Sequence, residues 1–294
     1  MATLIQGPGL GTVFHEWMHS WYQMMLANNE SLYAWLDEGF VTYAEDLVSA
    51  YYRQQKDNPA SGNEISTGLR NSGNEELPLY HADTYAGYFS LAKSGLEEPL
   101  TTHADHFNTN FAYARAAYSK GGVFLAQLGY IISDSLRDKT LLEYYKQWRF
   151  KHPNASDFIR VAEKVSGIQL DWYKEYWVNT TKTIDYSIDS LWEQAGKTKI
   201  RLRMIGQVPM PADVLLQYKD GSKATIYIPQ FSMFGAKPAE NSIPRIVQEP
   251  WKWTHPTYVF EVDKRLMNVQ SIEIDPTWRM ADVNRKNNKL ELNW

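Results

Sequence analysis

The chain has 294 residues and a mass of 34.0 kDa, which allows one large domain or two of ordinary size. Hydrophobic residues make up 44% of it and aromatic residues 14%, a composition typical of a globular protein rather than a disordered one. Lys and Arg number 30 against 34 Asp and Glu, and no basic run is long enough to follow a phosphate backbone, so we expect no nucleic-acid partner.

The first part of the chain has apolar residues spaced by three and four, which predicts helices. This pattern recurs in residues 14–25, 43–51, 111–132 and 141–150. Residues 156–165 have a polar start and a glycine just beyond their end, so we expect one more short helix there. Residues 53–76 are rich in polar residues and glycine, which favours a solvated loop or lid. No run approaches the roughly 18 apolar residues of a membrane span, so the sequence predicts a soluble protein.

From about residue 181 the apolar period changes to two, which predicts strands. Ile184, Tyr186 and Ile188 alternate with polar residues, and Asp220-Gly221 between two apolar runs is typical of a tight hairpin turn with positive φ. No helical pattern interrupts these strands, so we expect a small antiparallel β-sandwich. The sequence therefore predicts a helical part, residues 1–181, and a sandwich, residues 182–294.

The segment His15-Glu16-Trp17-Met18-His19 predicts a metal site. Positions i and i+4 share one face of a helix, so both imidazoles can bind one ion with the Glu16 carboxylate beside them. Cys is absent, which excludes a deformylase-type site, and Met25 stands where a metzincin needs its third His. Glu38 follows after 18 intervening residues, and we predict it as the third ligand of one zinc ion.

This spacing, with Tyr118-Ser119-Lys120-Gly121 further along, resembles the M1 family of gluzincin aminopeptidases, which includes aminopeptidase N and leukotriene hydrolase. The resemblance implies a multi-domain enzyme with a mainly α-helical, thermolysin-like catalytic lobe followed by a small β-sandwich. The family usually has Asn before the third ligand, where this chain has Asp37. Its Gly-x-Met-Glu-Asn segment, which helps to hold the substrate amine, is not matched before His15. We therefore expect a fragment whose N-terminal β-domain and amine-binding strand lie outside this chain.

Three more residues have predicted roles beside the ligands. Glu16 lies about 100° around the helix from His15, so it is free to act as general base. The match of the segment around Tyr118 to the family's transition-state tyrosine implies that Tyr118 stabilises the oxyanion. Glu45, two helical turns beyond Glu38, is either the acceptor for the second ring N–H of a ligand His or a solvated helix residue.

The leading functional hypothesis is a zinc exopeptidase that removes residues from the N-termini of peptides. A zinc endopeptidase, or the family's epoxide-hydrolysing branch, would use the same metal core. A noncatalytic binding or scaffold module is the third alternative, and the presence of both Glu16 and Tyr118 argues against it. The first residues lack the basic region of a signal peptide, and the compartment stays open.

Overall fold

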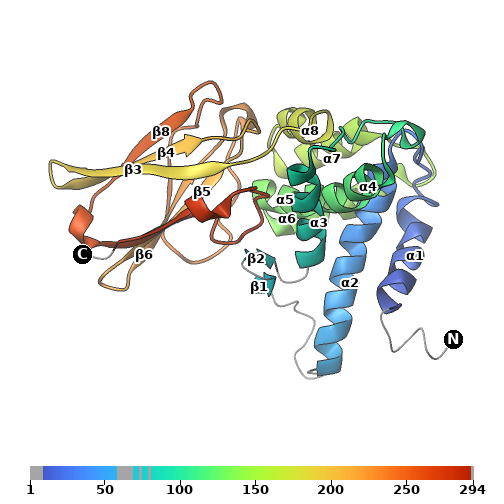
Figure 1. Cartoon of the computed structure of the whole chain (residues 1–294), viewed down its shortest axis with the longest axis horizontal. Helices are drawn as coiled ribbons and strands as arrows, with labels where there is room; N and C mark the ends of the chain where they lie inside the picture. Colours follow the sequence, from blue (N-terminus) through green and yellow to red (C-terminus); the bar gives the residue numbers. More distant parts are fainter. Residues whose placement is uncertain (1–8, 58–68, 73–74, 79–80, 293–294) are drawn as a thin grey trace.

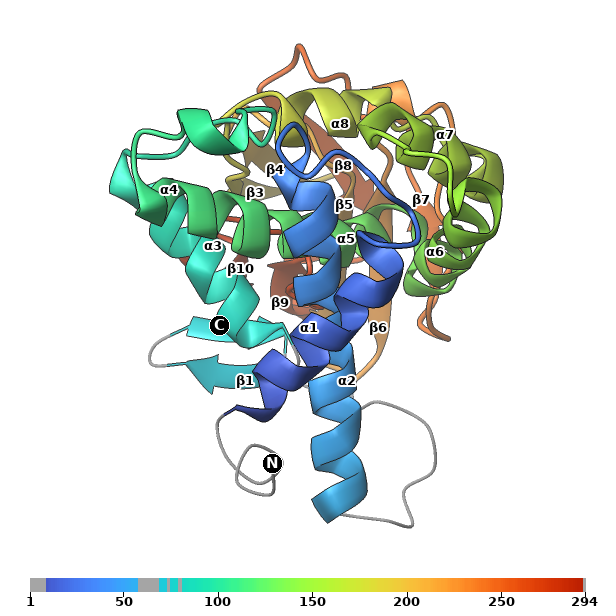
Figure 2. The same ribbon diagram turned by 90° about the vertical axis from the view of Figure 1, so that its right-hand side faces the viewer.

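The computed structural model describes residues 9–57, 69–72, 75–78 and 81–292. Helices gather on one side of the molecule, and the two larger sheets lie on the other (Figure 1). Figure 2 faces the helices and shows α1 (Leu10–Tyr22) lying against α2 (Phe40–Asp57) on the side away from the sheets. No helix among the described residues is both long and apolar enough to cross a bilayer.

Helices lie over most of the predicted ranges, and the structure has two further ones at Ala82–Ser94 and Asp171–Val178. Helix α7 begins with a capping box between Asn154 and Asp157 and ends at Gly167, which has a φ of 71°. Helix α5 is buried along its whole length, so it forms the centre of the helical part. The α-helices of the described residues are α1 (Leu10–Tyr22), α2 (Phe40–Asp57), α3 (Ala82–Ser94), α4 (Asn110–Ala114), α5 (Gly121–Ile132), α6 (Asp134–Trp148), α7 (Ala155–Ser166) and α8 (Asp171–Val178).

Two π-helical turns, η1 (Trp35–Gly39) and η3 (Arg115–Lys120), interrupt this pattern. Turn η1 continues directly into α2, and η3 joins α4 to α5, so the predicted helix over 111–132 is continuous but locally widened. A π-helical turn is rare and frequently marks a functional site. The short 3₁₀ segment η2 (Ala104–His106) lies between α3 and α4.

The expectation of a loop or lid over residues 53–76 is partly wrong. Helix α2 runs on to Asp57, because Arg, Gln and Lys in its last turns are good helix formers. Strands β1 (Leu69–Ser72) and β2 (Glu75–Pro78) pair with each other as an antiparallel ribbon. The rest of the expected loop lies outside the described residues.

The predicted sandwich strands form two sheets, with the orders β10-β9-β5-β6-β7 and β3-β4-β8. Gly221 has a φ of 82° in the β5–β6 hairpin, as the Asp-Gly pair predicts. The other strand pairs of the two sheets are antiparallel, as expected, and the pair β6–β7 is parallel, so the larger sheet is mixed. The long connection after β6 returns the chain to the same end of the sheet, which a parallel pair requires. The strands are β3 (Tyr186–Gln194), β4 (Lys197–Met204), β5 (Ala212–Tyr218), β6 (Lys223–Ile228), β7 (Arg245–Val247), β8 (Thr257–Val262), β9 (Val269–Ile274) and β10 (Lys289–Glu291).

One hydrophobic core runs through both parts of the molecule. It includes α5, with Phe124 and Leu128, as well as alternate residues of the sheets such as Val214 and Ile272. The last helix ends at Val178 and β3 begins eight residues later. The boundary near residue 181 stays a prediction, because the two parts share this core.

Candidate metal centre

Helix α1 presents two histidines one turn apart. The rings of His15 and His19 lie with their centroids 4.9 Å apart and at 79° to each other. The structure describes all of α1, and none of its residues is fully buried. The side chains of His15 and His19 are 12% and 18% exposed. The two imidazoles therefore lie at the edge of the helical part, where a peptide could reach them.

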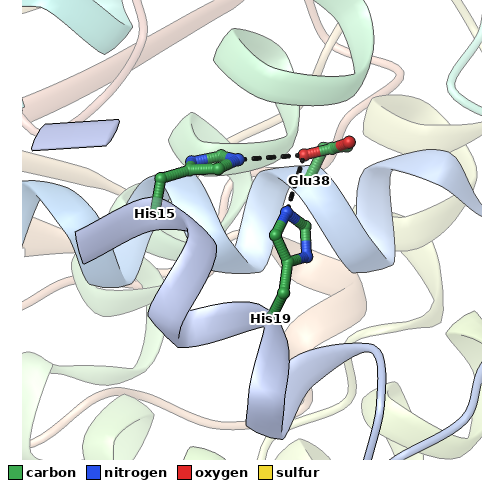
Figure 3. Close-up of side chains that lie close together, drawn as sticks. All are labelled: His15, His19 and Glu38. Carbon is green, nitrogen blue, oxygen red and sulfur yellow. Dashed lines mark hydrogen bonds and ion pairs between the residues drawn. The ribbon is translucent and has the colours of Figure 1, made fainter. Parts of the chain in front are cut away.

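Glu38, on the π-helical turn η1, meets both histidines. Its Oε2 atom lies 3.1 Å from His15 Nε2 and 3.4 Å from His19 Nε2, so both rings point at one oxygen (Figure 3). One ligand atom from each residue can be chosen so that all three lie within 4.8 Å of one another. Among the described residues this is the one group of three or more His, Asp or Glu side chains so arranged. The structure thus brings the three predicted ligands together, and their binding of a metal stays a prediction.

Each histidine also contacts a second carboxylate through its other ring nitrogen. His15 Nδ1 lies 3.1 Å from Glu45 Oε2, the first of the two alternatives predicted for Glu45. His19 Nδ1 lies 2.8 Å from Oδ1 of Asp37, which is only 3% exposed. Sequence reasoning did not predict this role for Asp37, although its departure from the family's usual Asn could have drawn attention to it. These contacts orient the rings so that each Nε2 atom faces Glu38.

The carboxylates around the two histidines strongly affect the pKa values of this cluster. Burial lowers the pKa of His15, but hydrogen bonds to Glu38 and Glu45 outweigh it and raise the pKa to about 9. Burial raises the pKa of Glu38, yet hydrogen bonds from His15 and Tyr118 hold it below its usual value. Burial raises the pKa of Asp37 to about 6 against the opposing charge of His19. A metal ion must therefore displace a proton from His15 in order to bind.

Tyr118, on the second π-helical turn η3, completes the cluster. Its ring stacks on that of His15, with centroids 5.7 Å apart and an angle of 12° between the planes. Its hydroxyl is hydrogen bonded to Glu38, and burial together with that carboxylate raises the pKa of Tyr118. Tyr118 is therefore protonated at neutral pH and can donate a hydrogen bond.

A close backbone contact holds η1 and η3 together. A Cβ atom placed on Gly39 would lie 2.6 Å from Gly121 Cα, far closer than real Cβ contacts. Only glycine fits at this crossing. Because Gly39 follows Glu38 directly and Gly121 follows η3, the crossing places Glu38 and Tyr118 at one site.

Glu16 follows His15 on α1, and its side chain is exposed. The geometry leaves it outside the cluster of His15, His19 and Glu38, as expected for a residue turned about 100° around the helix. Its role as a base stays a prediction.

Comparison with known proteins supports this description. Residues 10–177 match the profile of the peptidase family M1 domain. Aminopeptidase B of Mus musculus is 26% identical over 177 residues, which cover 58% of this chain and 22% of that protein. Aminopeptidase N of Streptomyces lividans is 25% identical over 171 residues, which cover 58% of this chain and 18% of that protein. The chain therefore spans about a fifth of the length of these curated relatives.

The fold also resembles a solved structure. The crystal structure of aminopeptidase A from Legionella pneumophila matches with a TM-score of 0.50 and 11% identity, and the match covers 93% of this chain and 26% of that one. At this identity the likeness concerns the fold alone. It extends over both the helical part and the sheets.

Proposed function

Since the chain belongs to peptidase family M1, we propose that it is the catalytic part of a zinc aminopeptidase, which hydrolyses the N-terminal peptide bond of peptides. One observation carries the proposal. His15 and His19 direct their Nε2 atoms at the same oxygen of Glu38, and Tyr118 binds that carboxylate as well. These are the groups that zinc-assisted amide hydrolysis requires, and they lie in one place.

His15, His19 and Glu38 would hold the zinc ion. The donor set fits this metal, because two imidazole nitrogens and one carboxylate oxygen are the ligands of a catalytic zinc site that keeps a fourth position open. When bound, zinc supplies a Lewis acid that polarises a carbonyl group and lowers the pKa of water to about 7. Asp37 and Glu45 would hold the two rings in the orientation that binding needs.

Proton transfer is the role that we propose for Glu16. A carboxylate next to the ligands can take a proton from the attacking water and deliver it to the leaving amine. Glu16 is exposed, and its direction around α1 differs from that of His15, so it can act without being a ligand. Support comes from its position in the HExxH segment.

Oxyanion stabilisation is the role that we propose for Tyr118. The carbonyl oxygen of the substrate becomes negative as water attacks, and a hydroxyl that stays protonated can donate a hydrogen bond to it. Tyr118 has such a hydroxyl, since burial and Glu38 raise its pKa. Stacking on His15 holds its ring beside the predicted metal position.

An endopeptidase or an epoxide hydrolase would use the same core, and the names of the relatives favour an aminopeptidase. We expect the groups that hold the substrate's free amine, and an N-terminal β-domain, in the part of the relatives that this chain does not match. A noncatalytic module would not need a base at Glu16 or a hydroxyl donor at Tyr118.

The proposal is tested with Glu16→Gln in the full-length protein. This variant should keep one zinc ion per molecule by elemental analysis, because the ligands are unchanged, and its kcat on an aminoacyl amide should fall by roughly 10²-fold or more. Glu175→Gln, which changes an exposed glutamate of α8, is the matched control and should keep full activity. Near-normal kcat in Glu16→Gln would remove Glu16 from the mechanism. Equal cleavage of an N-acetylated peptide would favour the endopeptidase alternative.

A further inference from the structure

Lys120 is a fully buried lysine close to the predicted catalytic tyrosine. It ends the π-helical turn η3, two residues after Tyr118, and its side chain is 0% exposed. Its Nζ atom lies 2.8 Å from Glu97 Oε1, whose side chain is only 6% exposed. An ion pair so deeply buried is unusual, because both charges lose their hydration.

The same lysine is fixed at several further points. Its Nζ atom donates to the carbonyl of Thr180 at 2.9 Å and lies 5.4 Å from the centre of the Trp177 ring. Trp177 Nε1 in turn donates to the backbone carbonyl of Lys120 at 3.2 Å. The end of η3 is therefore tied to α8 and to the residues just after it, and through Glu97 to the chain that follows α3.

The buried pair of Lys120 and Glu97 needs a reason beyond the packing of the core. Apolar side chains of similar volume usually stabilise a core as well as a buried ion pair does, or better. Burial lowers the pKa of Lys120, and the charge of Glu97 opposes that shift. Lys120 also fixes the position of the chain that carries it, through its ion pair with Glu97 and its charged hydrogen bond to the carbonyl of Thr180.

We propose that Lys120, held by Glu97 and Trp177, is a positioning residue that fixes the π-helical turn η3 and thereby places the hydroxyl of Tyr118. The proposal rests on the proposed role of Tyr118. Gly121, next to Lys120, fixes the other side of the turn through its contact with Gly39. A small displacement of a reacting group can lower a rate by up to about 10²-fold, so the anchoring of this turn matters for turnover.

The test compares stability with turnover in the full-length protein. The double substitution Lys120→Met with Glu97→Leu replaces the ion pair by apolar groups, so the midpoint of thermal unfolding should stay near that of the parent or rise. Zinc content should stay at one per molecule. The kcat on an aminoacyl amide should nevertheless fall roughly tenfold or more, with little change in KM. Unchanged kcat in this stable variant would overturn the proposal.

A double-mutant cycle with Tyr118→Phe separates positioning from a general structural effect. If the ion pair acts through Tyr118, replacing Lys120 and Glu97 should lower kcat less than twofold in a protein that already carries Tyr118→Phe. An equal loss in both backgrounds would overturn the proposal and leave the role of Tyr118 intact. Full activity of Tyr118→Phe itself would instead refute the proposed function of that residue.

Lys237 provides the matched control. It is also a buried lysine, 3% exposed, and it pairs with Asp213 at 2.6 Å and with Glu240 at 2.8 Å, but it lies in the β-rich part. Lys237→Met should lower the unfolding midpoint and leave kcat of the folded protein unchanged. Should Lys237→Met lower kcat as much as the Lys120 variant does, the effect would be a general result of losing a buried lysine, and the proposal would fail.

Discussion

The two histidines of the candidate metal centre each use both ring nitrogens. One nitrogen of each ring faces Glu38, and the other contacts Glu45 in His15 or Asp37 in His19. A ring held in this way has a fixed rotation, so it needs little reorientation when an ion binds. The two outer carboxylates also place negative charge near the predicted position of the cation.

Asp37→Asn tests the contribution of the outer carboxylate. Asn keeps the size and one oxygen of Asp but removes its charge, so the affinity for zinc should fall by roughly 10-fold or more. Competition with a chromogenic chelator at neutral pH measures the dissociation constant. Asp105→Asn, which changes an acid that is 86% exposed, is the control and should bind zinc like the parent. An unchanged dissociation constant in Asp37→Asn would show that His19 needs no charged partner.

The sequence could predict that His15, His19 and Glu38 lie together, but not all of the residues that support them. Helical periodicity alone places His15 and His19 on one face, and the spacing to Glu38 adds the third group. The contact of Asp37 with His19 could not be predicted, because neighbouring residues on an ordinary α-helix point in directions about 100° apart. If Glu38 faces α1, Asp37 should then face away from it. The π-helical turn at this point is a tertiary feature that no local pattern signals.

At the scale of elements, the crossing of η1 and η3 aligns two segments that lie far apart in the sequence. The local patterns predicted the helices on either side of the crossing and the β5–β6 hairpin, because capping residues and turn glycines act over a few positions. They did not predict the crossing itself or the parallel strand β7. Both depend on contacts between distant residues.

Gly39→Ala should disturb both halves of the site. Its new methyl group would have to displace the backbone of Gly121, so the free energy of unfolding should fall by about 1–3 kcal/mol or more. Zinc affinity and kcat should fall together, because Glu38 and Tyr118 both move. Denaturant unfolding and chelator competition measure these effects. Gly235→Ala is the control, since its Cβ would meet its nearest neighbour at an ordinary 3.5 Å. If Gly39→Ala were as stable as the parent, the close contact between Gly39 and Gly121 would be contradicted.

Helix α1 should depend on the metal for its stability. None of its thirteen residues, all of which the structure describes, is fully buried, and His15 and His19 contact Glu38 and Asp37 of η1. Zinc bound by these residues and Glu38 would tie α1 to η1. Hydrogen exchange of α1 amides should therefore slow when zinc is added, while exchange in α5 changes little. Equal protection of α1 with and without zinc would contradict this.

At the scale of the whole molecule, a polar network joins the helical part to the sheets. Tyr130 Oη donates to Pro211 O and accepts from the backbone N–H of Asp213 at 3.0 Å. Arg279 pairs with Asp134 at 3.0 Å and with Glu240 at 2.8 Å, so it connects α6 with the β-rich part. With the shared core, these contacts lead us to expect the two parts to unfold together.

The carboxylate of Glu240 in this network predicts how the stability of the fold depends on pH. Burial raises the pKa of Glu240, but hydrogen bonds and charges from Arg279 and Lys237 outweigh it and lower the pKa from 4.5 to about 2. A carboxylate with a lowered pKa stabilises the folded state above its unfolded pKa, and that stability is lost as the pH falls. Glu240 should therefore contribute on the order of 3 kcal/mol at neutral pH, and this contribution should disappear between about pH 4.5 and pH 2.

Glu240→Gln measures that contribution directly. The difference in unfolding free energy between the parent and this variant should be largest at pH 6–7 and should shrink steadily as the pH falls below about 4.5, because the protonated Glu240 of the parent then resembles Gln. Urea unfolding at a series of pH values gives the difference. Glu261→Gln is the control, since Glu261 pairs with Lys197 in an exposed position and should contribute little at any pH. A difference for Glu240→Gln that does not change with pH would mean that size and hydrogen bonding, rather than charge, make Glu240 important at the junction between the helices and the sheets.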